Sequence, residues 1–284
     1  MSIKHQLSAI FLAFATAGSI GQANAAAGER VLRFASYATE RPTEELHKLE
    51  PFQEQIEASL KRQGIRAKVE VRIYPTYENG ITAITSGQAD FSRLGPVSYV
   101  NAKARNPAIQ ILAVEAFEGK KQFEGVVIVR KDSPIQSVAD LKGKRIAFGE
   151  PGSTTGRYIP QAAMAKAGLH AKDLAGYEYL GRHDKVAFAV ASGSHDAGTT
   201  NMKTYKKYAE SKGLRDIARF PSPTQAWVSR PNLPPQLFQA LRQALLELQG
   251  PGLEYIDRNG FIPGDDHDYD ELRRTMKAAQ DFDN

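Results

Sequence analysis

The 284-residue sequence contains no cysteine. This absence excludes a disulfide framework, a thiol nucleophile and a lipid-modified N-terminal cysteine. The chain has no apolar run long enough to span a membrane, and it has no basic patch interleaved with aromatic residues that would indicate nucleic-acid binding. Its formal net charge is only +5, which suits an anionic ligand without requiring one.

The first residues have the pattern of a secretory signal peptide. Lys4 and His5 precede an apolar stretch over residues 7–15, and residues 23–25 (Ala-Asn-Ala) form a small-x-small cleavage site. We therefore expect cleavage after Ala25. Because no membrane anchor follows, the expected location of the exported chain is a bacterial periplasm.

Strand-like and helix-like segments alternate along the rest of the chain, which predicts an α/β fold. Residues 68–74 alternate with period two, as a half-buried strand does. Residues 51–61 and 235–248 instead carry apolar side chains at helical spacing.

An internal repeat predicts two similar lobes. Residues 84–91 resemble residues 190–197, because in each a helix ends at Ser-Gly and an Asp then opens a strand. The strand openings at residues 32–35 and 146–149 resemble each other in the same order. Two matched pairs in one order favour duplicated architecture over chance.

We expect residues 26–124 to form the first part of lobe 1 and residues 125–227 to form lobe 2. Residues 228–284 would complete lobe 1 and supply the C-terminal helices. Open α/β sheets bind ligands beyond the carboxyl ends of their strands, so a cleft between the lobes is the expected site. Four residues that follow predicted strands are candidates for its lining: Tyr37, Tyr77, Gly95 and Tyr99.

Three consecutive hydroxyl residues are the most informative feature of the chain. Ser153, Thr154 and Thr155 follow the buried strand predicted over residues 145–148, lie beside Gly156, and precede a helix predicted over residues 161–168. The unpaired N–H groups and the dipole at a helix N-terminus favour an anion, and hydroxyls add neutral donors. A single hydroxyl there could merely cap the helix. Three in a row favour a binding site, although the segment has neither the lysine of a P-loop nor a G-x-G-x-x-G spacing.

A second candidate is His183, which opens the helical run over residues 183–190. Its place at another helix N-terminus would bring a second donor to the same cleft. The alternative is a structural histidine, with Asp184 as the helix cap.

Five segments in order resemble the periplasmic phosphate-, phosphite- and phosphonate-binding proteins that serve ABC importers (the PhnD-like group). They are residues 90–99, 125–134, 153–160, 181–184 and 196–198. The resemblance implies a two-lobed, type II-like periplasmic binding protein, with a mixed sheet flanked by helices in each lobe and a hinge between. It implies a monomeric, non-enzymatic receptor that delivers its ligand to a membrane permease. Ser153, Thr154, Thr155 and His183 would then hold the phosphorus oxygens, with no metal or cofactor.

One departure from this family affects the expected ligand. Relatives that take aminoalkylphosphonates hold the ammonium group with carboxylates, whereas the matching positions here are Lys203 and Gln225. The expected ligand is therefore phosphite, phosphate or a small phosphonate without an amino group. Two other functions remain open: an oxyanion sensor that presents its closed state to a membrane histidine kinase, and a metal-dependent hydrolase.

Overall fold

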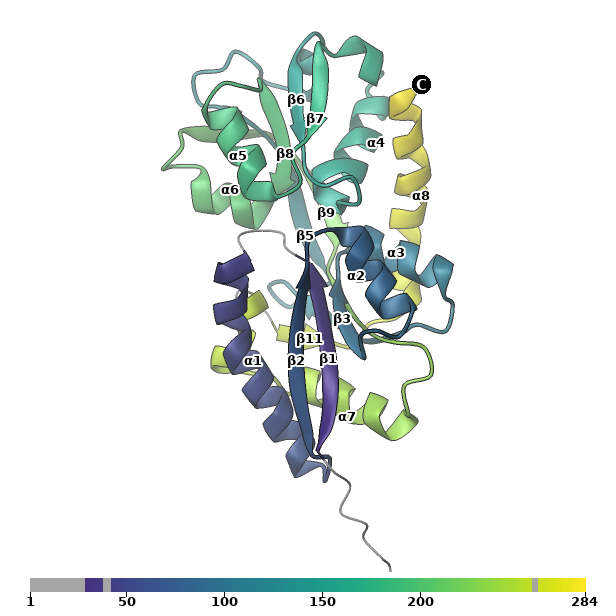
Figure 1. Ribbon diagram of the computed structural model, residues 1–284. Helices are drawn as coiled ribbons and strands as arrows, with labels where there is room; N and C mark the ends of the chain where they lie inside the picture. Colours follow the sequence, from purple (N-terminus) through teal and green to yellow (C-terminus); the bar gives the residue numbers. More distant parts are fainter. Residues whose placement is uncertain (1–28, 38–41, 257–259) are drawn as a thin grey trace, which may run out of the picture.

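The structure is a computed structural model that describes residues 29–37, 42–256 and 260–284. The signal peptide expected over residues 1–25 lies outside the described residues. The described chain forms two lobes, each a mixed sheet flanked by helices (Figure 1), which confirms the predicted α/β class. No helix among the described residues is both long and apolar enough to cross a membrane.

The first lobe, the lower one in Figure 1, contains a six-stranded sheet in the order β11-β4-β10-β3-β1-β2. Strands β1, β2 and β3 are parallel, while β10 is antiparallel to β3 and β4. Its strands are β1 (Arg30–Tyr37), β2 (Ala67–Tyr74), β3 (Phe91–Leu94), β4 (Gln110–Ala116), β10 (Ala226–Ser229) and β11 (Gly260–Ile262). Its helices are α1 (Pro42–Arg62), α2 (Tyr77–Thr85), α3 (Pro96–Arg105) and α7 (Pro235–Leu246).

The second lobe contains a five-stranded sheet in the order β7-β6-β8-β5-β9. Its strands are β5 (Gln122–Arg130), β6 (Arg145–Phe148), β7 (Gly176–Tyr179), β8 (Ala197–Asn201) and β9 (Leu214–Pro223). Its helices are α4 (Ile159–Lys166), α5 (His183–Ala191) and α6 (Met202–Tyr208). The order β1-α1-β2-α2-β3 of the first lobe thus recurs here as β6-α4-β7-α5-β8.

The internal repeat has a structural cause in two equivalent aspartates. Asp90, just before β3, accepts a hydrogen bond at 2.9 Å from the backbone amide of Arg33 in β1. Asp196, just before β8, accepts one at 2.8 Å from the amide of Arg145 in β6. In each lobe the carboxylate therefore fixes the start of the third strand of the repeat against the first.

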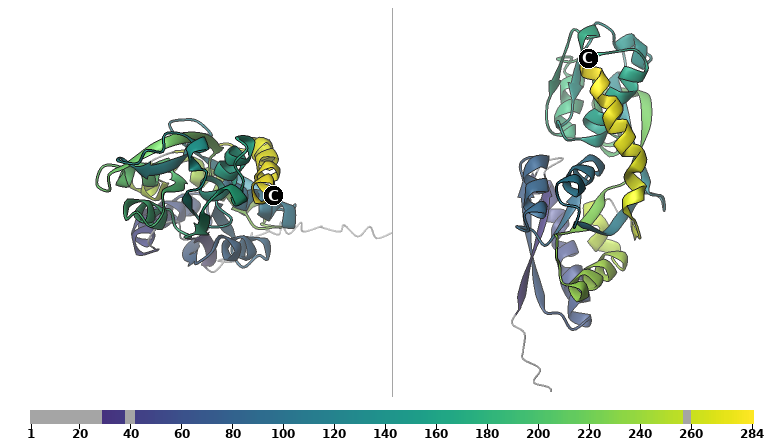
Figure 2. Two further views of the ribbon diagram at one scale, coloured as in Figure 1. Left: turned by 90° about the horizontal axis from the view of Figure 1, so that it is seen from above. Right: turned by 90° about the vertical axis from the view of Figure 1, so that its right-hand side faces the viewer.

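The chain crosses between the sheets over residues 117–121 and 224–225, two or three residues before the boundaries expected at 124/125 and 227/228. The C-terminal helix α8 (Asp270–Ala278) then returns to the second lobe, along which it runs in Figure 2. Phe282 beyond it is fully buried in the core of that lobe. The C-terminal helices therefore link the two lobes in addition to the two crossings.

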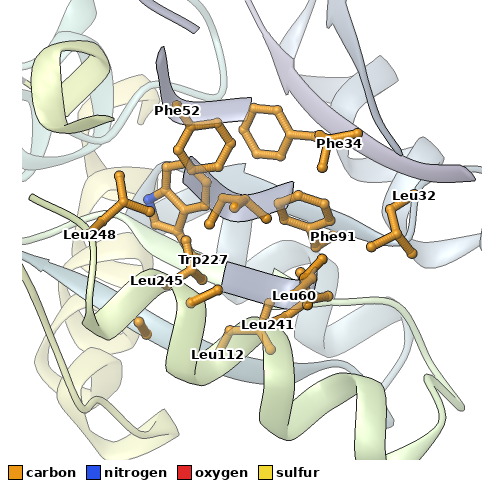
Figure 3. Close-up of a cluster of buried hydrophobic side chains, with 14 of the residues drawn as sticks. Leu32, Phe34, Phe52, Leu60, Phe91, Leu112, Trp227, Leu241, Leu245 and Leu248 are labelled. Atoms are coloured by element: carbon orange, nitrogen blue, oxygen red, sulfur yellow. The ribbon is translucent and has the colours of Figure 1, made fainter. Parts of the chain in front are cut away.

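An aromatic cluster forms the core of the first lobe (Figure 3). The ring of Phe34 in β1 stacks on Trp227 in β10, with centroids 5.1 Å apart and an interplanar angle of 10°. From α1, the predicted apolar positions Phe52, Ile56 and Leu60 are all buried against this cluster. Burial of each such side chain contributes about 1.5–3 kcal/mol, which holds β1 in place.

Candidate ligand-binding site

A cavity of about 440 Å³ lies between the two lobes. Its lining includes residues that follow the carboxyl ends of equivalent strands in both lobes, as expected for open α/β sheets. Seven of the nine residues singled out from the sequence line it: Tyr37, Tyr77, Gly95, Ser153, Thr154, Thr155 and His183. The other two, Gly156 and Tyr99, do not.

The hydroxyl cluster occupies the first turn after β6. Ser153 is the N-cap of a five-residue π-helix over Thr154–Tyr158, which leads directly into α4, and its Oγ accepts a hydrogen bond from the Gly156 amide at 3.0 Å. Helical backbone thus begins at Thr154, whereas the sequence predicted a helix start at Gln161. The wide π-turn accommodates Pro160, which has no N–H to donate. The hydroxyls consequently lie in the first helical turn, where unpaired amides favour an anion.

Close backbone packing supports this turn. Gly149 donates from its amide to the Gly156 carbonyl at 2.8 Å, and a Cβ on Gly156 would lie 2.9 Å from the Gly149 Cα. In β5, a Cβ on Gly125 would lie 2.8 Å from the Thr155 Cβ. Gly156 therefore shapes the site from behind and does not line the cavity.

The turn also reaches across to the first lobe. The Thr154 Oγ1 accepts a hydrogen bond at 3.0 Å from the amide of Val97, in the first turn of α3. Ser153 and Thr154 are buried, and each hydroxyl oxygen already accepts one amide proton. Since a hydroxyl also carries one proton of its own, both residues keep a donor for a bound anion.

Glu150 makes a second connection between the lobes. Its carboxylate accepts hydrogen bonds from the Gly152 amide, at 2.5 Å, and from the backbone of Tyr77, the first residue of α2. Burial of this carboxyl raises its pKa, although the two backbone bonds and Arg157 act in the opposite direction. The loop before the π-helix thus contacts the N-terminus of α2, and the first residue of the π-helix contacts that of α3.

Two stacked tyrosines form the lining on the side of the first lobe. The rings of Tyr37 and Tyr77 are 3.9 Å apart at an interplanar angle of 23°. The Tyr37 hydroxyl accepts a hydrogen bond from the Gly95 amide and donates to the Ser98 Oγ at 3.1 Å. Burial raises the pKa of Tyr37 to about 12, so the phenol stays neutral and does not repel an anion.

His183 is the first residue of α5 and lines the cavity while only 4% exposed. The N-cap of α5 is Arg182, so the alternative in which Asp184 caps the helix is wrong. Asp184 instead accepts hydrogen bonds from the Arg182 guanidinium at 3.0 and 3.2 Å and from the Lys185 amide at 3.0 Å. The His183 imidazole and the hydroxyl cluster therefore line one cavity.

Tyr99 points toward the C-terminal segment instead of the cleft. Its hydroxyl donates to the Asp266 Oδ1 at 2.7 Å, and its ring lies 4.6 Å from that of Tyr269. Asp266 is 167 residues away in the sequence, so no local pattern could indicate this partner.

A buried ion pair at the cleft was missed in the sequence. The Arg93 Nε donates to the Glu115 Oε1 at 2.5 Å, and that oxygen also accepts from the Trp227 indole at 3.0 Å. Burial opposes the charge on Arg93, but the Glu115 carboxylate raises the pKa of the guanidinium overall. Both residues line the cavity, as do Lys203 and Gln225. Glu115 within an otherwise apolar strand was the available signal, because a buried carboxylate needs a partner.

The residue types and their order match a known protein family. The model of the periplasmic substrate-binding proteins of phosphonate ABC transporters matches residues 34–269. The chain belongs to this family. Its homologues are binding components and not enzymes, and its members are periplasmic binding proteins.

Individual relatives are distant. The phosphonates-binding periplasmic protein of Escherichia coli is 29% identical over 68% of this chain and 57% of its own length. A probable phosphite-binding protein of an ABC transporter from Prochlorococcus marinus is 29% identical over 49% of each chain. The matches thus span about half the length of these curated relatives. A solved structure of PhnD1 from that organism with methylphosphonate superposes with a TM-score of 0.79 at 20% identity, covering 89% of this chain and 99% of the other, which shows a common fold.

Proposed function

We propose that this protein captures a small phosphorus oxyanion between its lobes, in the periplasm, after cleavage of its signal peptide at Ala25. The ligand would be phosphite, phosphate or a small phosphonate without an amino group, and the closed monomer would deliver it to an ABC permease. The observation that carries the proposal is the pair of buried hydroxyls, Ser153 and Thr154, at a helix N-terminus in the cleft. The names of the relatives, which refer to phosphite and phosphonates, support this ligand class.

The donors in the cleft are sufficient for useful affinity. Micromolar binding requires about 8 kcal/mol, and a hydrogen bond to a charged group contributes roughly 1.5–3 kcal/mol. Four donor side chains converge on the cavity, Ser153, Thr154, Thr155 and His183. If lobe closure excludes water, their hydrogen bonds together would supply about 8 kcal/mol. The cost of ordering the ligand must be subtracted from this sum.

Isothermal titration of the mature protein tests the proposal. The panel is phosphate, phosphite, methylphosphonate, 2-aminoethylphosphonate and sulfate. We expect at least one of the first three to bind with micromolar or better affinity, and 2-aminoethylphosphonate to bind more weakly. Tight binding of sulfate with no response to any phosphorus compound would overturn the proposal.

A further inference from the structure

The third strand of the repeat ends at the cleft in each lobe. Asp90 precedes β3 and Asp196 precedes β8, and at the same distance along the chain from each aspartate stand Gly95 and Asn201. Both residues are the N-cap of the helix that follows, and both line the cavity. In Figure 1, α6, the helix after Asn201, lies at the end of the second lobe that is turned toward the first. Asn201 is therefore the counterpart of Gly95 in the second lobe.

The register of the sheet places Asn201 beside the hydroxyl turn. Asn201 in β8 lies directly opposite Gly125 in β5, so their Cβ positions share one face of the sheet, about 4.5–5.5 Å apart. A Cβ on Gly125 would lie 2.8 Å from the Thr155 Cβ, so the hydroxyl turn packs against this face. Thr199, on the same face, donates from its Oγ1 to the Gly156 carbonyl at 2.7 Å. Asn201 follows Thr199 along this face and, unlike it, lines the cavity.

The Asn201 carboxamide has a fixed orientation. Its Oδ1 accepts a hydrogen bond at 2.8 Å from the Thr204 amide and so caps α6. Because only the oxygen of a carboxamide can accept from a backbone amide, this bond determines which end of the group is Nδ2. Within the described part of the chain, no acceptor lies within hydrogen-bond distance of Nδ2. The partly exposed Asn201 therefore offers the cavity a donor that is held in place by its own cap.

Polar side chains follow all three parallel strands of the second lobe's repeat. Ser153 and Thr154 follow β6, His183 follows β7, and Asn201 ends β8. In the sheet, β6 lies between β7 and β8. Because the carboxyl ends of parallel strands meet at one edge of a sheet, the hydroxyl turn has His183 on one side and Asn201 on the other.

We infer that Asn201 contacts the ligand and donates a hydrogen bond from Nδ2 to an oxygen of its phosphorus group. A phosphorus group with several oxygens can accept bonds from the hydroxyl turn and from the residues on both sides of it. The donor is the side chain of Asn201 and not the backbone amides of α6. This inference rests on the proposed function, because it adds a residue to the same site.

The test uses isothermal titration of the full mature chain with phosphate, phosphite and methylphosphonate. In Asn201→Ser a hydroxyl can still cap α6, but the Nδ2 donor is removed. We expect the dissociation constant of the tightest ligand to rise roughly 10- to 100-fold, the effect of losing one hydrogen bond to a charged group. Asn201→Asp keeps the cap and places a negative charge where the donor was, so the rise should be larger. Without ligand, the melting temperatures should stay close to that of the wild type, because Asn, Asp and Ser cap helices about equally well.

Asn232→Asp is the matched control. It makes the same chemical change at an exposed position of the first lobe that does not line the cavity, and it should leave the dissociation constant unchanged. NMR of the isotope-labelled wild type adds a direct measurement. The side-chain amide signal of Asn201, assigned by its absence in either Asn201 variant, should shift when the ligand binds, and that of Asn232 should not.

Each alternative outcome has a distinct meaning. Wild-type affinity in Asn201→Ser, or an Asn201 side-chain signal that does not move on binding, would overturn the inference and leave the proposed function standing. A loss of affinity confined to Asn201→Asp would also overturn it, since a new charge near the site weakens binding without any contact from Asn201. If the wild type binds none of the three compounds, the proposed function fails and the inference fails with it.

Discussion

The two lobes share one plan but contribute different chemistry to the cleft. The first lobe presents side chains that are committed to one another: Arg93 to Glu115, and Tyr37 to Gly95 and Ser98. The second lobe presents Ser153 and Thr154, whose hydroxyls accept amides and still have protons to donate. Under the proposed function, the first lobe would therefore form a rigid side of the cleft, and the hydroxyl turn of the second lobe would hold the anion.

Removing the hydroxyls of Ser153 and Thr154 should have the largest effect on ligand affinity. For Ser153→Ala/Thr154→Ala we expect a loss of about 3–6 kcal/mol in ligand binding, because two hydrogen bonds to a charged group disappear. The free energy of unfolding should fall by about 2–4 kcal/mol, because the helix cap is lost and the buried Val97 amide loses its acceptor. Isothermal titration and urea unfolding measure the two quantities.

Ser192→Ala is the control for the hydroxyl variant, since it removes an exposed hydroxyl at the end of α5 in the same lobe. It should change neither quantity measurably. A double alanine variant that unfolds without denaturant, or that keeps its affinity, would contradict the assignment of this turn to binding.

Removing the Arg93–Glu115 ion pair of the first lobe should instead lower the free energy of unfolding. Glu115→Ala leaves the Arg93 guanidinium buried without its carboxylate and the Trp227 indole without its acceptor. Removal of one partner of a buried ion pair typically costs about 3–5 kcal/mol, which urea unfolding would detect. Glu115→Gln keeps an acceptor for the indole and should lose less. Equal, small effects of both substitutions would show that the ion pair is not a structural support.

The two sides of the cleft also differ in how far the sequence predicted them. The hydroxyl turn, His183 and the Asp90/Asp196 repeat could be predicted because each is local, a few residues at a strand end or a helix start. The Arg93–Glu115 pair and the Tyr99–Asp266 bond join segments that only the fold brings together. The early helix start at Thr154 was missed for a third reason, since the helical pattern of residues 161–168 begins only after Pro160, whereas the π-turn accommodates this proline.

A smaller change, Gly125→Ala, tests whether β5 of the second lobe positions the hydroxyl turn. The added Cβ would lie 2.8 Å from the Thr155 Cβ, so the hydroxyl turn must shift. Overpacking of this kind costs about 1–3 kcal/mol, and we expect ligand affinity to fall with stability. Gly260→Ala is the matched control, because a Cβ there meets no atom within 4 Å. Unchanged affinity in Gly125→Ala would show that Thr155 is not held by this contact.

The smallest expected effect concerns Glu150, which joins the second lobe to the backbone of Tyr77 in the first. Burial raises the pKa of this carboxyl above its ordinary value of 4.5, so the folded protein binds the proton more strongly than the unfolded chain. Stability from this group is therefore present at low pH and is lost as the pH rises through the raised pKa. The melting temperature of the wild type should fall relative to that of Glu150→Gln as the pH rises above 4.5. The two charged neighbours, Arg157 and Glu78, are present in both proteins.

Glu78→Gln supplies a control of opposite sign for the Glu150 experiment. The hydrogen bond from Arg105 lowers the pKa of Glu78, so its contribution to stability is lost as the pH falls through that lowered pKa. Because this pair is largely exposed, its effect should be small. Parallel pH profiles for the wild type and Glu150→Gln would mean that the Glu150 carboxyl is solvated in solution. The loop before the π-helix would then not hold the lobes together through this residue, and closure would depend on the Thr154–Val97 bond and on the ligand itself.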